Sequence, residues 1–245
     1  MSNKLFGVVS IYGLLIACAI LAGTLLCQRE ARRRGLPRDT GIDMILWAVP
    51  LAVIGARLYY VAFRWPLYAG DPLSILRVWE GGLAIYGGII GGFVGLALLS
   101  RKSKIPLLTL LDIGAPMVIL GQAIGRWGNY FNGEAYGRVI TNPAWQFFPV
   151  AVLADGQWHM ATFFYESCWN LLGFLLLWLY RRRAKRPGDV FFRYLLWYGA
   201  GRAVIEGLRT DSLMWGPVRV SQALSLLLAL GAAAAILIRR KKAPD

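Results

Sequence analysis

The chain has 245 residues, of which 57% are hydrophobic and 16% are charged, and it carries a net charge of +14. That charge suits nucleic-acid binding, but the basic residues lie in short loops beside apolar runs, where anionic membrane lipids explain them better. We therefore exclude a nucleic-acid partner and predict an all-α integral membrane protein, with a single polytopic domain covering residues 1–245.

Seven apolar runs are predicted to cross the membrane as helices. They cover residues 5–27, 43–63, 83–100, 105–125, 162–180, 189–207 and 219–238. We expect the first run to be retained as a span. A cleaved signal peptide has its positive charges before the apolar core, whereas five arginines follow this run.

Lysine and arginine residues set the predicted topology. Seventeen of the 27 fall in four blocks, at residues 29–38, 101–104, 181–186 and 239–242. With seven spans, all four blocks lie on one side of the membrane, and the positive-inside rule makes this the cytoplasmic side. The sequence therefore predicts an N-terminus outside and a C-terminus in the cytoplasm.

Two connections on the predicted outer side are long enough to form structures of their own. Residues 64–82 mix Trp65 and Trp79 with charged residues, as expected of a short arm lying in the membrane interface. Residues 138–161 carry an Asp-Gly turn pair at residues 155–156 between apolar stretches, which predicts a hairpin in a small outer head.

The segment 125–137, G-R-W-G-N-Y-F-N-G-E-A-Y-G, places an arginine, two asparagines and a glutamate at the outer end of an apolar helix. Charged groups at or near a membrane are costly, and those that occur usually line a cavity on a substrate path. The chemistry is therefore expected at this segment.

Other polar residues within the spans are expected to join the segment. Arg202 and Glu206 lie four residues apart and Tyr198 one turn earlier, so the three share one helical face. Two explanations stay open for Glu206, which either neutralises Arg202 in an internal ion pair or takes part in the site. The side chains expected at one outward-facing cavity are Arg126, Arg202, Arg57, Asn129, Asn132, Glu134, Tyr86 and Tyr198. Because a guanidinium matches two phosphate oxygens, a phospholipid is the simplest substrate.

The predicted third span is rich in glycine. Close packing against another helix is the expected role of Gly91, Gly92 and Gly95. Gly87 and Gly88 follow Tyr86 near the outer interface, where we expect the missing side chains to make room for a lipid headgroup.

The sequence predicts neither a metal site nor a cofactor. Its three cysteines lie within predicted spans without a C-x-x-C pair or neighbouring histidine and carboxylate ligands, and His159 is the single histidine. No Walker loop, nucleophile elbow or Ser/His/Asp pattern is present, so known hydrolase templates fail.

Four blocks of the sequence form a pattern. They are Ile11-Tyr12-Gly13-Leu14, then Arg77-Val78-Trp79-Glu80-Gly81-Gly82 with Tyr86-Gly87-Gly88, then residues 125–139, and finally Tyr198-Gly199-Ala200-Gly201-Arg202 through Glu206 and Arg209. In this order and over nearly the whole chain, they resemble the motifs of the bacterial prolipoprotein diacylglyceryl transferases.

The resemblance implies a multi-pass enzyme of the bacterial cytoplasmic (inner) membrane. Such an enzyme transfers the diacylglyceryl group of phosphatidylglycerol to the lipobox cysteine thiol that follows a prolipoprotein signal peptide, and it releases glycerol phosphate. By this resemblance, Arg126 contacts the lipid phosphate and Arg202 is essential at the same site. Supporting roles fall to Asn129, Glu134, Gly137, Tyr12 and Tyr198.

The general base is left open by a departure from the family pattern. Many relatives have a histidine before the paired glycines where this chain has Tyr86. Phenols are poor bases at neutral pH because they ionise at a pKa of about 10. We expect Tyr86 first to hydrogen-bond the lipid or the incoming thiol, and second to act as a base activated by neighbouring cations. His159 is expected to be an interfacial residue of the outer head.

Two other classes of protein explain part of the pattern. A transporter for an anionic solute would also gather arginines at a membrane cavity, but the chain shows no pair of similar halves. A membrane scaffold that binds anionic lipid would explain the glycine packing, but it would not need Arg126, Asn129 and Glu134 within nine positions.

Overall fold

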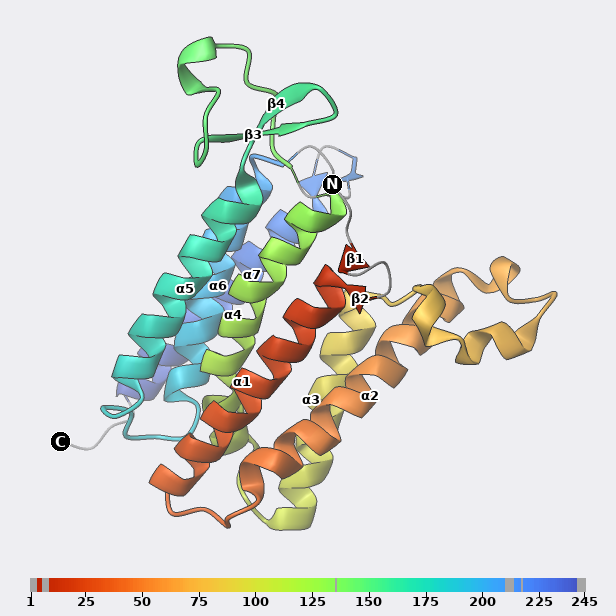
Figure 1. Ribbon diagram of the computed structural model, residues 1–245. Helices are drawn as coiled ribbons and strands as arrows, with labels where there is room; N and C mark the ends of the chain where they lie inside the picture. The colour runs from red at the N-terminus through yellow and green to blue at the C-terminus, as the bar shows by residue number, and fades with distance from the viewer. Residues whose placement is uncertain (1–3, 6–8, 135, 210–213, 217, 242–245) are drawn as a thin grey trace. The chain divides into compact units, whose positions relative to one another are not determined.

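A computed structural model describes residues 4–5, 9–134, 136–209, 214–216 and 218–241, and within them the chain is mostly helical (Figure 1). Its α-helices are α1 (Ile11–Arg33), α2 (Thr40–Phe63), α3 (Ile85–Ser103), α4 (Leu107–Asn132), α5 (Thr162–Tyr180), α6 (Asp189–Glu206) and α7 (Val220–Lys241). Contacts divide the chain into two compact units, one formed by residues 1–23 with 112–245 and the other by residues 24–111.

The helices confirm an all-α membrane protein. Within the described residues, α1, α2, α4, α5 and α7 are long and apolar enough to cross a bilayer. The other two helices are not in this set. Helix α6 carries four charged residues within 18 positions, and α3 contains five glycines and ends on a basic turn.

The observed helix boundaries agree best with the predicted spans where the apolar run ends abruptly. Helix α5 covers the residues predicted for the fifth span, 162–180. Helix α1 runs past its predicted end to Arg33 because Glu30 pairs with Arg33 and Arg34, three and four residues along the helix. Helix α4 continues beyond the predicted 125 to Asn132, so the polar segment begins inside a helix. Residues 6–8 of the first predicted span lie outside the described residues.

In the unit of residues 24–111, helices α2 and α3 pack closely. A Cβ atom added at Gly91 or Gly95 would collide with the backbone carbonyl of Leu51 or Trp47, so the predicted packing role of these two glycines is confirmed. It does not extend to Gly92, where an added Cβ would make ordinary contacts at 3.7 Å.

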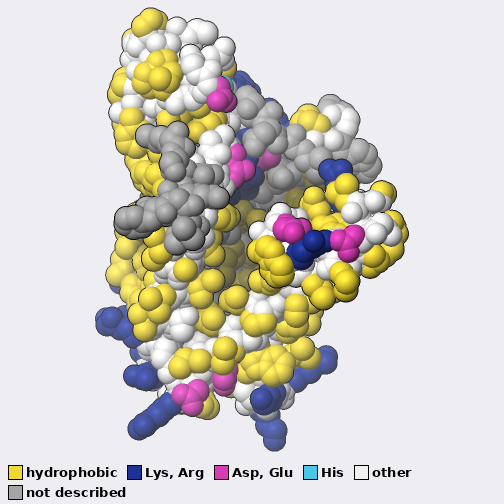
Figure 2. Space-filling model, turned by 45° about the vertical axis from the view of Figure 1, so that its right-hand side comes forward, with side chains coloured by type: hydrophobic (Ala, Val, Ile, Leu, Met, Phe, Trp, Pro, Cys, Tyr) yellow, Lys and Arg dark blue, Asp and Glu magenta, His cyan; other side chains and the backbone are white. Residues whose placement is uncertain are grey.

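The predicted arm is a compact segment of the same unit. It consists of the short 3₁₀ helices η1 (Trp65–Leu67), η2 (Pro72–Leu76) and η3 (Val78–Glu80), which lead from α2 to α3 (Figure 1). On its surface Arg77 pairs with Asp71 and lies 3.5 Å from Glu80. Charged side chains lie among apolar ones on the face of the molecule that Figure 2 shows. Trp65 and Trp79 are 54% and 77% exposed, and the place of the arm in the membrane interface stays a prediction.

In the other unit, α6 packs between α5 and α7. The carboxylate of Asp112 in α4 accepts hydrogen bonds from the backbone N–H groups of Gly188, Val190 and Phe191 at 2.8–3.0 Å. Helix α6 thus begins at a buried acid of another helix, which satisfies its unpaired N–H groups and suits its dipole.

The predicted hairpin is confirmed. Strands β3 (Ala151–Ala154) and β4 (Gln157–Met160) pair in antiparallel register around Asp155 and Gly156, which both have positive φ. The hairpin leads directly into α5 (Figure 1). Two further short antiparallel pairs are β1 (Lys4–Leu5) with β2 (Val9–Ser10) and β5 (Met214–Trp215) with β6 (Val218–Arg219).

Candidate active site

The centre of the candidate site is one buried carboxylate, that of Glu166 in α5. Its Oε1 lies 2.8 Å from Nη2 of Arg126 in α4, and its Oε2 accepts a hydrogen bond of 2.9 Å from Nη1 of Arg202 in α6. The carboxyl side chain is 3% exposed. Three helices therefore meet at one acid that holds the two arginines expected to bind phosphate.

A second acid completes the cluster. Nη2 of Arg202 lies 2.5 Å from Oε2 of Glu206, which is also buried. The predicted ion pair between these residues is therefore present, and it forms part of a larger network. Two arginines and two glutamates balance in charge, which makes their burial tolerable in a membrane protein.

The arginine cluster retains access to solvent, because the side chains of Arg126 and Arg202 are 18% and 14% exposed while both glutamates are almost fully buried. A guanidinium has five N–H donors, so an arginine held by a carboxylate on one edge can bind a phosphate on the other. The glutamates thus hold the two guanidinium groups in place without occupying all of their N–H donors.

Polar neighbours surround the cluster. Asn129, one turn after Arg126, accepts a long hydrogen bond of 3.4 Å from its Nη1 through Oδ1. Tyr198, one turn before Arg202, lies within electrostatic reach of all four charged side chains and stacks on Tyr194. The predicted neighbours Asn129 and Tyr198 therefore lie with the arginines.

Tyr12 approaches the same stretch of α4. Its ring lies so close to Gly128 that a Cβ atom there would collide with the aromatic carbons. Gly128 stands between Arg126 and Asn129 in the sequence. The glycine therefore allows the ring of α1 to lie beside the polar segment.

The rest of the polar segment folds back after α4. Gly133 has a positive φ of 72°, and the N–H of Glu134 donates to the carbonyl of Asn129 at 3.0 Å. The carboxylate of Glu134 is exposed and accepts a hydrogen bond of 2.9 Å from Asn132. The structure therefore pairs Glu134 with Asn132, and no contact with an arginine is seen among the described residues. Ala135 lies outside them.

Gly137 joins the hairpin to the end of α6. Its N–H donates to the carbonyl of Met160 at 3.0 Å, and it pairs with Arg209 in an isolated bridge. An added Cβ would lie 2.7 Å from side-chain atoms of Met160 and Thr162. Only a residue without a side chain fits this junction.

The side chains of His159 and Tyr136 pack beside Gly137. His159 lies in β4 with Nδ1 3.1 Å from the carbonyl oxygen of Gly137, and its ring lies beside Tyr136. Burial raises the pKa of the Tyr136 phenol, and the nearby Tyr130 and Asp155 raise it further. Tyr136 therefore remains a neutral hydrogen-bonding group.

Four expected site residues belong to the other unit. Arg57 is 5% exposed and donates to five backbone carbonyls of the arm and its junction with α3, at 2.6–3.3 Å. Gly87 packs against Gly55, and an added Cβ at Gly88 would meet only ordinary contacts at 3.7 Å. Tyr86 is half-buried beside Tyr59, and its hydroxyl makes no hydrogen bond within the described residues. These positions give Arg57 and Gly87 structural roles, and their expected roles in substrate binding stay predictions.

Sequence reasoning missed two residues of α5. Glu166 was not singled out from the sequence, although an acid inside a predicted span is itself a signal of function. Asn170 lies one turn later, is 0% exposed, and has no hydrogen-bond partner for its amide among the described residues. An unsatisfied buried amide is costly, so Asn170 is available to a polar ligand.

No group of three or more metal-binding side chains is found in the part of the chain that the structure describes. The arginine–glutamate cluster itself offers fixed cations and hydrogen-bond donors. Such an arrangement binds an oxyanion and stabilises negative charge that develops on it.

Comparisons with known proteins agree on one family. Residues 4–238 match the family described as prolipoprotein diacylglyceryl transferase. A phosphatidylglycerol–prolipoprotein diacylglyceryl transferase from Listeria welshimeri is 44% identical over 237 residues, which are 94% of this chain and 86% of the relative. Proteins of the same name from Halalkalibacterium halodurans and Bacillus cereus are 43% and 44% identical; 94% of this chain aligns with 82% and 87% of their lengths.

Proposed function

Because the chain belongs to the prolipoprotein diacylglyceryl transferase family, we propose that it transfers the diacylglyceryl group of phosphatidylglycerol to the lipobox cysteine of prolipoproteins. The observation that carries this proposal is the pair of arginines held at Glu166. Two guanidinium groups from different helices, fixed by one acid, form a ready site for a phosphodiester.

The reaction needs little more than such a site. The cysteine sulfur attacks the glyceryl carbon that bears the phosphate ester, a C–S bond forms, the C–O bond breaks, and glycerol phosphate leaves. Negative charge grows on the departing phosphate oxygen, where Arg126 and Arg202 stabilise it. Because these donors are already fixed by Glu166, they need no reorganisation during the reaction.

The two glutamates have a different role from the arginines. Glu166 and Glu206 form ion pairs with the arginines, so they orient the cations, and while ionised they cannot donate to phosphate. Asn129 and Tyr198 lie beside the cations and supply neutral donors, and Tyr12 and Gly137 shape the surroundings. The amide of Asn170, one helical turn after Glu166, offers a further donor.

The residues of the other unit and Glu134 enter the proposal on their places in the sequence and on the family resemblance. Tyr86 hydrogen-bonds the lipid or the incoming thiol, and Gly87 and Gly88 leave space near the headgroup. The thiol proton passes to a base that is not assigned. Replacing Tyr86 by phenylalanine separates these roles, since a hydrogen bond to bound lipid affects KM, whereas loss of a base affects kcat and its pH profile.

The proposed setting is the bacterial cytoplasmic membrane. All seven helices cross it, with α6 able to do so because its inner charges are paired, the N-terminus lies outside, and the arm and head lie on the outer side. The basic ends of α1, α3, α5 and α7 support this orientation. The exposed tryptophans of the arm support its place in the interface.

The function is tested with the purified full chain in vesicles that contain phosphatidylglycerol, by mass spectrometry of a lipobox peptide. We expect a thioether-linked diacylglyceryl product, and a rate at least about a hundredfold lower for Arg126→Ala and for Arg202→Ala. Arg101→Ala, an exposed arginine at the end of α3, is the matched control and should act like the wild type.

A transporter or a lipid-binding scaffold predicts no product in this assay. The absence of thioether from folded wild-type protein would therefore reject the proposed function. Full activity of both arginine variants would leave the function in place and reject the assigned site.

A further inference from the structure

A cleft lies between α5 and α6, and none of the four side chains of the arginine–glutamate cluster lines it. It has a volume of about 860 Å³, and its walls are almost entirely apolar. Leu176 and Leu179 of α5 and Leu196 and Ala200 of α6 line it, and all four are exposed. No residue assigned to the transfer site lines this cleft.

Two tryptophans close the cleft at the end nearer the cluster. The rings of Trp169 and Trp197 stack at 4.2 Å, and each indole N–H donates to the other residue's backbone carbonyl at 3.0–3.1 Å. Gly173 and Gly201 lie against these rings, where a Cβ atom would collide with them. The pair is therefore a fixed wall of the cleft.

Basic residues surround the other end. Arg182, Arg183 and Arg193 line the cleft there, and a second cavity of about 450 Å³ shares Tyr180, Arg183 and Arg193 with it. The basic residues lining the two cavities are Arg182, Arg183, Lys185, Arg186, Arg193, Arg239 and Arg240. The one acid among the lining residues is Asp189, and its Oδ2 already accepts the backbone N–H groups of residues 185 and 186.

Several of these cations are held in place while others are available. Arg193 packs over the ring of Tyr180 at 4.0 Å and donates to the carbonyl of Asp189 at 2.7 Å. The side chains of Arg182 and Arg183 are exposed and make no hydrogen bond or ion pair within the described residues. An anion at the junction of the two cavities would meet several cations and the single carboxylate of Asp189.

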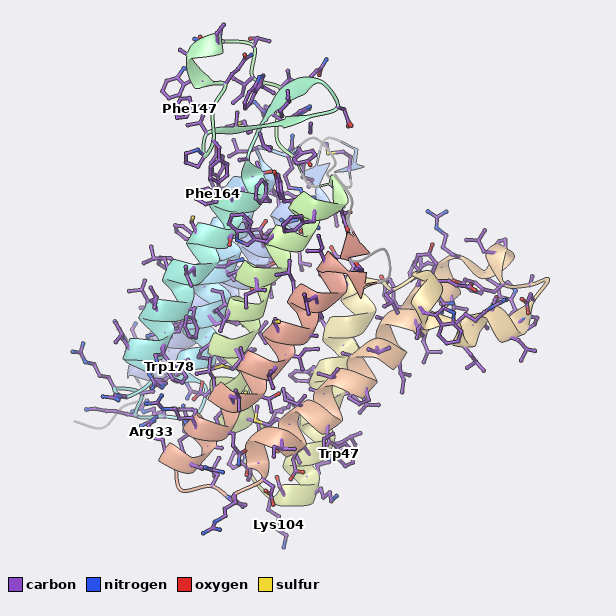
Figure 3. All side chains as sticks on the ribbon, viewed as in Figure 1. Arg33, Trp47, Lys104, Phe147, Phe164 and Trp178 are labelled. Atoms are coloured by element: carbon purple, nitrogen blue, oxygen red, sulfur yellow. The ribbon has the colours of Figure 1, made fainter. Side chains whose placement is uncertain are left out.

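The dimensions match one leaflet of a bilayer. From Trp169 to Tyr180 the helix rises about 17 Å at 1.5 Å per residue, and half of a bilayer's hydrocarbon core is about 15 Å. Trp178 marks the basic end of α5 and Phe164 its opposite end (Figure 3). An acyl chain lying along the cleft would bring its phosphate to the arginines.

We propose that this cleft binds an anionic phospholipid, with an acyl chain between α5 and α6 and the phosphate at Arg182, Arg183 and Arg193. The site is separate from the transfer site, because Glu166 lies 14 residues before Tyr180 in the same helix, about 21 Å away along its axis. A bound lipid here stabilises the contact of α5 with α6, and therefore the helices that carry Glu166 and Arg202. A polyanion or an acidic peptide would use the arginines but would leave the apolar walls uncovered.

Lipid binding to the full chain in detergent tests the proposal by native mass spectrometry. The probes are dioleoyl phosphatidylserine, which is anionic, and dioleoyl phosphatidylcholine, which is not. We expect the double variant Arg182→Gln with Arg183→Gln to weaken phosphatidylserine binding by at least about tenfold, with little change for phosphatidylcholine. Leu176→Trp keeps the charge but fills the apolar part, and it should weaken phosphatidylserine binding as well.

The matched control is Arg32→Gln with Arg38→Gln, which removes two exposed arginines elsewhere. Binding like that of the wild type in this control, with losses in both cleft variants, supports the site. Unchanged binding in the double cleft variant overturns the proposal. It is equally overturned if Leu176→Trp has no effect or if the control loses as much as the cleft variant, since charge alone would then explain the binding. These outcomes are independent of transferase activity.

Discussion

Two regions of the molecule bury an arginine in different ways. Arg57 directs its guanidinium to five backbone carbonyls of the arm and its junction with α3, whereas Arg126 and Arg202 direct theirs to the carboxylates of Glu166 and Glu206. Carbonyl partners are fixed by the backbone and bind every N–H of the arginine. Carboxylate partners are side chains, and they leave part of each guanidinium open to another ligand.

The difference separates a structural arginine from one suited to function. Every N–H group of Arg57 is bound by a backbone carbonyl of the arm or of its junction with α3. If a ligand took over these N–H groups, the carbonyls would lose the donor that holds the arm together. The arginines of the cluster sit in a charge-balanced network in which a phosphate can take over some of the hydrogen bonds. Breaking either arrangement should therefore have different consequences for stability and for activity.

The largest effect is expected when Glu166 is changed to glutamine. The variant leaves Arg126 and Arg202 with one buried carboxylate between them, and removing one partner of a buried pair costs about 3–5 kcal/mol. A clear drop in the thermal unfolding midpoint of the detergent-solubilised protein should follow, together with loss of transfer. The control is Glu80→Gln, which changes an exposed acid of the arm. An unchanged midpoint for Glu166→Gln would show that the ion pairs of Glu166 with Arg126 and Arg202 do not stabilise the protein.

A somewhat smaller loss of stability is expected when the contact between α2 and α3 is disturbed. Helix α2 carries Arg57. Gly91→Ala places a methyl group against the backbone of Leu51, and such overpacking costs up to about 3 kcal/mol. Gly92→Ala is the neighbouring control, since its methyl group meets only ordinary contacts. Thermal unfolding of the two variants should differ, and equal midpoints would contradict the close packing seen here.

Arg57→Gln should destabilise by about 2 kcal/mol, because several arm carbonyls lose a charged donor. The loss should be concentrated in the arm, so amide hydrogen exchange across residues 72–82 is expected to speed up more than exchange in α5. Arg64→Gln, exposed at the end of α2, serves as the comparison. Uniform exchange changes over the whole chain would contradict a local role for Arg57.

The smallest effect is expected for His159→Ala. Its ring contacts one carbonyl and Tyr136 in the hairpin region and belongs to neither arginine arrangement. We expect most of the transferase activity and a stability change of no more than about 0.5 kcal/mol. Loss of activity in a normally folded variant would assign His159 a part in the reaction.

Much of the fold follows from apolar runs and turn residues. Helix α5 has the predicted limits because its apolar run starts after the hairpin and stops at three arginines. The charged extension of α1 could not be predicted in this way, since hydropathy does not register the pairs that Glu30 makes along the helix. The limits of a span and of its helix are set by different forces.

The site was predictable in its residue types but not in its connections. The polar segment and the spacing of Arg202 and Glu206 identified the cations and one acid. That Glu166 would join two helices, and that Arg57 would bind backbone carbonyls, depends on which helix faces meet. A backbone carbonyl has no signature in the sequence, and one acid in an apolar run does not reveal its partners.

The central claim is that Arg126 and Arg202 share the phosphate of phosphatidylglycerol. A structure of the full chain with this lipid bound, in nanodiscs and without peptide, tests it most directly. We predict phosphate oxygens within hydrogen-bond distance of both guanidinium groups, with Glu166 still holding at least one of them. A phosphate bound elsewhere, with both arginines fully engaged by Glu166 and Glu206, would contradict the account.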